Sequence, residues 1–143
     1  MGHVSDILEA KGGDVLDIDG EATVLDAVRK MVDSNVGSLL VMEAGRLAGI
    51  VTERDYLRRV TLEGRDERTT PVREIMTAAL VYATPDTSIE ECMAIMTERR
   101  IRHLPILDEA QKVVGVVSIG DLVKFQSKEQ SVQIKFLTDY ISG

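Results

Sequence analysis

Two short stretches of the chain repeat one polar pattern. Residues 49–55 read Gly-Ile-Val-Thr-Glu-Arg-Asp and residues 115–121 read Gly-Val-Val-Ser-Ile-Gly-Asp, so in both a hydroxyl residue precedes an aspartate by three positions. A hydroxyl residue that follows an apolar strand is typical of a helix N-terminus, where free backbone N–H groups favour an anion. An aspartate one turn later can accept two hydrogen bonds from the vicinal diol of a ribose. The pattern therefore indicates partners for phosphate and ribose, as in a nucleotide.

The same spacing also describes an ordinary capping box. In that interpretation Thr52 and Asp55, or Ser118 and Asp121, satisfy only the backbone groups of the helix that they begin. A single copy favours this structural interpretation. Two copies in register favour a site, and they raise the question of whether the rest of the chain is also duplicated.

The hydrophobic pattern indicates that the chain is a tandem duplication. Each half has a helix with an apolar stripe, then an apolar strand, a short turn, a returning strand and the capped helix. Val24 aligns with Ile89 at an offset of 65, and Gly49 aligns with Gly115 at an offset of 66. One extra residue in the second hairpin turn accounts for the change, because turns tolerate insertions. We therefore expect an α+β protein of two βαββα repeats.

The polar residues 64–71 form the one evident linker. We predict short strands at residues 15–18 and 80–83, ahead of the two repeats. A unit of about 60 residues buries little surface alone, so we expect the repeats to pack about a pseudo-twofold axis with paired ligand sites between them. The predicted divisions are a first repeat with its leading helix at 1–66, a second repeat at 67–127 and a C-terminal helix, a dimer contact, at 128–143.

Charge and composition exclude several classes of function. The net charge of −7 and the pI near 4.8 argue against nonspecific binding to nucleic acid or to an anionic membrane. No apolar run approaches the length of a membrane span, and the N-terminus lacks the pattern of an export signal. The single cysteine, Cys92, cannot form an internal disulfide, which fits a reducing compartment. We expect a cytoplasmic protein.

The duplicated pattern resembles a tandem pair of CBS domains, the Bateman module, and in particular the small stand-alone bacterial pairs. The resemblance covers about residues 4–125. It rests on residues 49–55 and 115–121, on Arg-His-Leu-Pro-Ile-Leu-Asp at 102–108 and on Val-x-x-Ile-Met at 72–76. It implies a regulatory module that binds an adenosine-containing ligand of the AMP, ATP, NAD or S-adenosylmethionine class between the repeats. It also implies a homodimer that signals by conformational change to a separate effector protein.

The resemblance further implies roles for single residues. Asp55 and Asp121 would each hold a ribose diol, and Arg54 would contact phosphate. Further contacts to the ligand would come from hydroxyl residues, from the leading strands and from the start of the later strands: Thr52, Ser118, Leu16, Ile18, Val81, Tyr82, Ala83, Ser38, Arg102, His103 and Pro105. We assign the last three to the second site, with Asp121. Ser38 stands where the second repeat has His103, so we expect unequal sites, with the second better equipped.

Other basic and nucleophilic residues are less informative. Arg99 and Arg100 are either a solvated helix end or part of the ligand site. Cys92 lies on an apolar helix face and is expected to be a buried, inert thiol.

The sequence lacks a set of residues for catalysis. The two histidines are far apart, and no clustered metal ligands or nucleophile–base pair are evident. We therefore expect no enzyme, no metal and no catalytic cofactor. Two alternatives remain open: an interaction module with empty, degenerate sites, and, less favoured, a nucleotide-hydrolysing enzyme.

Overall fold

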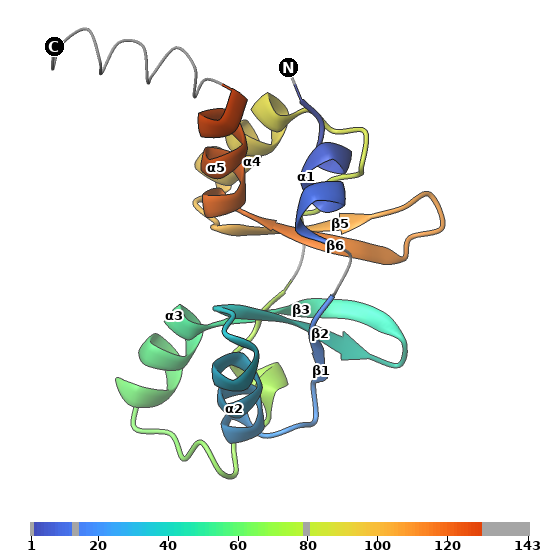
Figure 1. Ribbon diagram of the computed structural model, residues 1–143. Coiled ribbons are helices and arrows are strands. Elements are labelled where there is room, and N and C mark those ends of the chain that lie inside the picture. Colours follow the sequence, from blue (N-terminus) through green and yellow to red (C-terminus); the bar gives the residue numbers. More distant parts are fainter. Residues whose placement is uncertain (1, 13–14, 79–80, 130–143) are drawn as a thin grey trace, which may run out of the picture.

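The computed structural model describes residues 2–12, 15–78 and 81–129 and confirms an α+β fold of two repeats. In Figure 1 the two sheets lie between two outer layers of helices, with the first repeat below and the second above. The elements in chain order are α1 (Val4–Lys11), β1 (Asp17–Asp19), α2 (Val24–Ser34), β2 (Ser38–Glu43), β3 (Arg46–Thr52), α3 (Glu53–Tyr56), η1 (Leu57–Thr61), η2 (Val72–Glu74), β4 (Thr77–Ala78), α4 (Ile89–Arg99), β5 (His103–Leu107), β6 (Val113–Ser118) and α5 (Ile119–Glu129).

The two repeats show the same local rules at the ends of their long helices. The Thr23 hydroxyl accepts a hydrogen bond from Asp26 N at 3.2 Å and begins α2, and Ser88 accepts one from Glu91 N at 3.1 Å and begins α4. Both helices end in a left-handed residue, Asn35 in α2 and its counterpart in α4. Each helix has 11 residues and buries one apolar stripe against its own sheet. The predicted duplication is therefore present in the structure.

The first sheet has the strand order β1-β2-β3-β4, and β5 pairs with β6 in the second. Ile18 pairs with Val41 in parallel, and Ala83 forms the equivalent parallel bridge with Ile106. That bridge is all that the described residues show of the strand predicted at 80–83, because Ala83 alone exchanges backbone hydrogen bonds with β5. The strand β4, which pairs with β3, was not predicted.

The leading segments of the two repeats are exchanged. Val4 and Ile7 of α1 are buried in the core of the second repeat, whereas Val72 and Ile75 are buried in the core of the first. The prediction that the leading helix belongs with the first repeat is therefore wrong in space. An amphipathic stripe shows only that a helix has an apolar face, and either core can cover that face.

Two glycines lie where the exchanged leading segments come close to a strand. A Cβ atom at Gly49 would lie 2.5 Å from the carbonyl oxygen of Thr77, and one at Gly115 would lie 2.5 Å from a methyl group of Leu8. Gly49 and Gly115 open the two repeated motifs. Gly49 lies beside the leading segment of the second repeat, and Gly115 lies beside the leading helix of the first. Close approach of a neighbouring segment, by its backbone at Gly49 and by a side chain at Gly115, is the physical reason for glycine at both positions.

The predicted linker packs against the start of α2. Val24 N donates to Thr70 O and Leu25 N to Glu67 O, both at 2.9 Å. The Tyr56 hydroxyl donates to Glu67 Oε2 at 2.6 Å. This segment therefore supplies acceptors for N–H groups that a helix leaves free in its first turn. It is an ordered part of the first repeat.

The predicted C-terminal helix at 128–143 lies outside the described residues, apart from the end of α5 at Glu129. None of the helices in the part of the chain that the structure describes is long and apolar enough to cross a membrane.

Candidate functional site

Two clefts of different size lie between the repeats. The larger one, named the Asp55 cleft, has a volume of about 920 Å³. It is lined by Gly37, Ile50, Thr52, Glu53, Arg54, Asp55, Arg58, Thr77, Ala78, Val81, Arg99, Arg100, Ile101, Arg102, His103 and Pro105. The smaller one, named the Asp121 cleft, has a volume of about 350 Å³. It is lined by Leu8, Lys11, Gly12, Val15, Leu16, Asn35, Val36, Gly37, Ser38, Leu40, His103, Gly115, Val116, Ser118 and Asp121.

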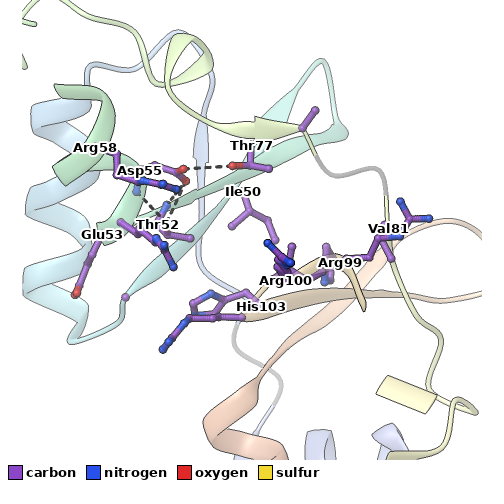
Figure 2. A pocket seen from close by; sticks show the side chains of 16 residues that line it. Ile50, Thr52, Glu53, Asp55, Arg58, Thr77, Val81, Arg99, Arg100 and His103 are labelled. Carbon is purple, nitrogen blue, oxygen red and sulfur yellow. Dashed lines mark hydrogen bonds between the residues drawn. The ribbon is translucent and has the colours of Figure 1, made fainter. Parts of the chain in front are cut away.

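A complete capping box positions the carboxylate of the Asp55 cleft. Thr52 N donates to Asp55 Oδ2 at 3.0 Å, and Asp55 N donates to Thr52 Oγ1 at 3.1 Å. The Thr77 hydroxyl donates to Asp55 Oδ1 at 3.3 Å (Figure 2). The capping interpretation of the motif is therefore confirmed. The cap leaves acceptor capacity on the carboxylate for a ligand, because its two oxygens offer about four acceptor positions.

The facing wall of the Asp55 cleft is basic. Arg99, Arg100 and Arg102 are exposed at the end of α4 and the approach to β5, and Arg54 and Arg58 come from the first repeat. Among the described residues, none of these five arginines lies within 4.0 Å of a carboxylate. The lining has two carboxylates, those of Glu53 and Asp55, so its net charge is +3 with His103 neutral. In a chain with a net charge of −7 this concentration of positive charge favours an anion.

His103 lines both clefts. Its burial lowers the pKa of the imidazole below the ordinary value, opposed by Asp121 and Asp55 and assisted by Lys11 and Arg102. The side chain is therefore neutral at pH 7, and it can donate one hydrogen bond and accept another.

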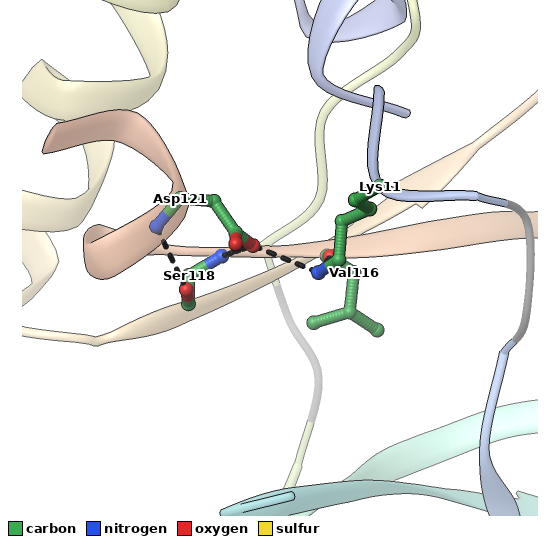
Figure 3. A network of polar contacts seen from close by, with 4 residues as sticks. All are labelled: Lys11, Val116, Ser118 and Asp121. Atoms are coloured by element: carbon green, nitrogen blue, oxygen red, sulfur yellow. Dashed lines mark hydrogen bonds and ion pairs between the residues drawn. The ribbon is translucent and has the colours of Figure 1, made fainter. Parts of the chain in front are cut away.

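In the Asp121 cleft, the carboxylate of Asp121 is already paired with a lysine. Lys11 Nζ donates to Asp121 Oδ2 and to Val116 O, both at 2.8 Å (Figure 3). Ser118 N also donates to Asp121 Oδ2, at 2.9 Å, and Asp121 N donates to Ser118 Oγ at 3.0 Å. Burial pushes the pKa of Asp121 upward, but the hydrogen bonds from Lys11 and Ser118 outweigh it and hold the pKa below the ordinary value. Asp121 is thus an anion with a cation already bound to it.

The structure distributes the predicted site residues between the two clefts in another way than predicted. Arg102 and Pro105 line the Asp55 cleft, and His103 lines both, whereas Ser38 lines the Asp121 cleft. The prediction that the site with Asp121 is better equipped is therefore wrong. Each cleft combines the capped helix of one repeat with the strand start of the other. A sequence motif does not show how the repeats are rotated against each other.

The predicted residues of the leading strands have mixed outcomes. Leu16 lines the Asp121 cleft and Val81 the Asp55 cleft. Ile18 packs on the core of the first repeat and Ala83 is buried in that of the second. The side chain of Tyr82 is 45% exposed, and none of these last three lines either cleft.

Among the lining residues that were not predicted are Arg58, Thr77 and Lys11. Arg99 and Arg100, for which a place in the ligand site was left open, both line the Asp55 cleft. Arg58 lies four residues after Arg54, one helical turn further, so spacing alone could have indicated it. Thr77 and Lys11 belong to the exchanged leading segments. No local pattern in the sequence indicates that these two residues line a cleft.

The described residues offer no candidate metal centre. No three histidine, cysteine, aspartate or glutamate side chains gather there as metal ligands. Cys92 is buried in the core of the second repeat, and this burial raises the pKa of its thiol to about 11.

Comparison with known proteins supports the duplication. A family model of the CBS domain matches residues 4–61 and 72–128. The mitochondrial CBS domain-containing protein CBSX3 of Arabidopsis thaliana is 40% identical over 149 residues, covering 98% of this chain and 72% of that protein. The CBS domain-containing protein YhcV of Bacillus subtilis is 37% identical over 131 residues, covering 92% and 90%. A solved structure of a protein with CBS domains from Burkholderia ambifaria is 46% identical with a TM-score of 0.85, covering 90% and 96%.

Proposed function

Because this chain belongs to the CBS-domain family, we propose that it is a regulatory module that binds an adenosine phosphate in the Asp55 cleft. The observation that supports this most strongly is the composition of the cleft. The Asp55 carboxylate, a partner for ribose, comes from one repeat, and Arg99, Arg100 and Arg102, partners for phosphate, come from the other. A volume of about 920 Å³ suits a ligand of nucleotide size.

A ligand in this cleft would contact both repeats at once. Its binding free energy would then favour one arrangement of the two repeats over others, and a separate effector protein would recognise that arrangement. We propose no chemical step, because the carboxylate beside the Thr52 and Thr77 hydroxyls, that of Asp55, already accepts the helix-cap hydrogen bond from Thr52 N and is assigned here to the ribose.

The Asp121 cleft is a second, smaller candidate. Asp121 and Ser118 repeat the geometry of Asp55 and Thr52, with Leu16 and Ser38 beside them. We propose that it accepts a ribose only after Lys11 is displaced. An aspartate already paired with Lys11 is also what the alternative function, an interaction module with empty sites, leads one to expect.

We also propose a cytoplasmic homodimer. Exposed apolar side chains on η1 and α5 support a contact between two copies: Leu57 is 55% exposed and Val123 is 50% exposed. The buried free thiol of Cys92 is compatible with a reducing compartment.

Thermal unfolding with a panel of ligands tests the proposed function. AMP, ATP, NAD and S-adenosylmethionine are added separately, and at 100 times its dissociation constant a ligand stabilises the fold by about 2.7 kcal/mol. We expect at least one to raise the melting temperature. If none does at millimolar concentration, the interaction module is the better account. If the nucleotide is hydrolysed under the same conditions, the protein is a nucleotide-hydrolysing enzyme.

A further inference from the structure

The helices α2 and α4 end in the same unusual backbone conformation but in different residues. Asn35 has φ 54° and Arg100 has φ 56°, both in the left-handed region. Each backbone N–H closes its helix, Asn35 onto Met31 O and Arg100 onto Met96 O. The two positions are related by the repeat offset of 65, so the fold requires the same backbone from both.

Asparagine and arginine differ in how well they suit that backbone. Asparagine is one of the few residues besides glycine that visits the left-handed region routinely, and arginine is not. Arg100 therefore carries a backbone cost that its counterpart Asn35 avoids. Backbone strain of this kind motivates a search for a role of the side chain.

The side chain of Arg100 is exposed and lines the Asp55 cleft. Figure 2 shows it on the wall that faces Asp55, near His103. Asn35 lines the Asp121 cleft, so the two residues hold equivalent places in the two clefts.

The segments around these two positions differ in charge. Residues 99–103 read Arg-Arg-Ile-Arg-His, and the equivalent residues 34–38 read Ser-Asn-Val-Gly-Ser. The first repeat forms the same backbone without any of the three arginines, so the fold does not require them. They turn one of two equivalent walls into a strongly positive one, opposite Arg54 and Arg58.

On the premise of the proposed function, we propose that the Asp55 cleft selects its ligand by phosphate charge and prefers a nucleoside triphosphate to a monophosphate. Arg100 is the specificity-determining residue. A monophosphate brings a charge of about −2, which leaves part of the net +3 of the lining uncompensated. Each further phosphate adds charge and acceptors for charge-assisted hydrogen bonds. With the ribose on Asp55, a longer phosphate chain can extend to the facing wall.

The variant Arg100→Asn tests this role without harm to the fold. It installs the residue that the first repeat already uses at the equivalent position, so we expect a higher unfolding midpoint than in the wild type. The matched control is Gln111→Asn. Gln111 also has a left-handed backbone, with φ 66°, but it lies in the turn between β5 and β6, outside the clefts.

The measurement is calorimetric titration of AMP and ATP into the wild type and both variants. We expect the wild type to bind ATP at least about tenfold more tightly than AMP, the factor that one charged hydrogen bond supplies. Arg100→Asn should weaken ATP about tenfold and AMP by less than about threefold. Gln111→Asn should leave both affinities unchanged. Arg99→Gln serves as a second variant with the same expected direction.

Other outcomes separate this inference from the proposed function. If the wild type binds AMP and ATP equally, or if Arg100→Asn leaves the preference intact, charge selection by Arg100 is wrong and the nucleotide site stands. If neither nucleotide binds to the wild type, the proposed function fails and this inference fails with it.

Discussion

Lys11 and Asp121, which lie 110 positions apart in the chain, form an ion pair with 2.8 Å between Nζ and Oδ2. The pair joins the end of α1 to the start of α5. The ammonium group of Lys11 takes up an acceptor position of the Asp121 carboxylate that a ribose would need. The equivalent carboxylate, Asp55, receives a neutral hydroxyl from Thr77 at 3.3 Å. The two repeated motifs therefore differ in how available their aspartates are to a ligand.

Replacement of Lys11 by methionine should open the Asp121 cleft. With the ammonium group gone, we expect a second ribose to bind, so the stoichiometry of adenosine measured by calorimetry should rise from one to two. The side chain of Lys11 is 42% exposed, so the loss of stability should be below about 1 kcal/mol. Lys112→Met, in an exposed turn, is the control. An unchanged stoichiometry would show that Lys11 does not close the cleft.

Alanine at the two motif glycines should have unequal costs. In Gly49→Ala the new Cβ meets the backbone oxygen of Thr77, which cannot move without its strand, whereas in Gly115→Ala it meets the flexible end of Leu8. Overpacking costs about 1–3 kcal/mol, and we expect the upper part of this range for Gly49→Ala and the lower part for Gly115→Ala. Urea unfolding measures both. Equal costs would contradict the close approach of the β4 backbone to Gly49 in β3.

The unliganded protein should lose stability as the pH falls below about 6.5. Burial lowers the pKa of His103 in the folded state, so between its ordinary pKa of 6.5 and the lowered value the unfolded chain binds more protons. Protons therefore favour unfolding in that interval. His103→Gln should flatten the decline in unfolding free energy between pH 7.5 and 5.5, and His3→Gln should not. A slope that survives His103→Gln would place its origin elsewhere.

The thiol of Cys92 should be unreactive in the folded protein. Burial raises its pKa to about 11, which removes both the thiolate and access to it. A thiol-specific chromogenic reagent at pH 8 should label it only as fast as the protein opens, and within seconds in urea. Fast labelling under native conditions would show that the core around α4 is open.

Features that depend on local pattern were predicted well from the sequence. The duplication, the hairpins and the capping boxes at Thr52 and Ser118 follow from residue type and spacing, and the structure has all of them. The left-handed ends of α2 and α4 also depend on local pattern. They were not predicted, although asparagine suits the left-handed backbone at Asn35 and the repeat offset of 65 relates that position to Arg100.

Features that depend on how the two repeats pack were not predicted. The apolar stripe of α1 fits either core, and its burial in the second follows from the path of the chain. The assignment of Arg102 and Pro105 to the wrong aspartate has the same origin. Their place in the Asp55 cleft depends on the rotation of one repeat against the other, which a motif within a single repeat does not encode.

The most direct test of the account compares Asp55→Asn with Asp121→Asn. Asparagine keeps an acceptor for each helix cap but loses the charge and part of the capacity to hold a diol. We measure ATP binding to both variants and to the wild type by calorimetry. We predict that Asp55→Asn abolishes measurable binding and that Asp121→Asn, whose carboxylate is already held by Lys11, changes the affinity less than about threefold. If Asp121→Asn is the more damaging of the two, the assignment of the nucleotide to the Asp55 cleft is wrong.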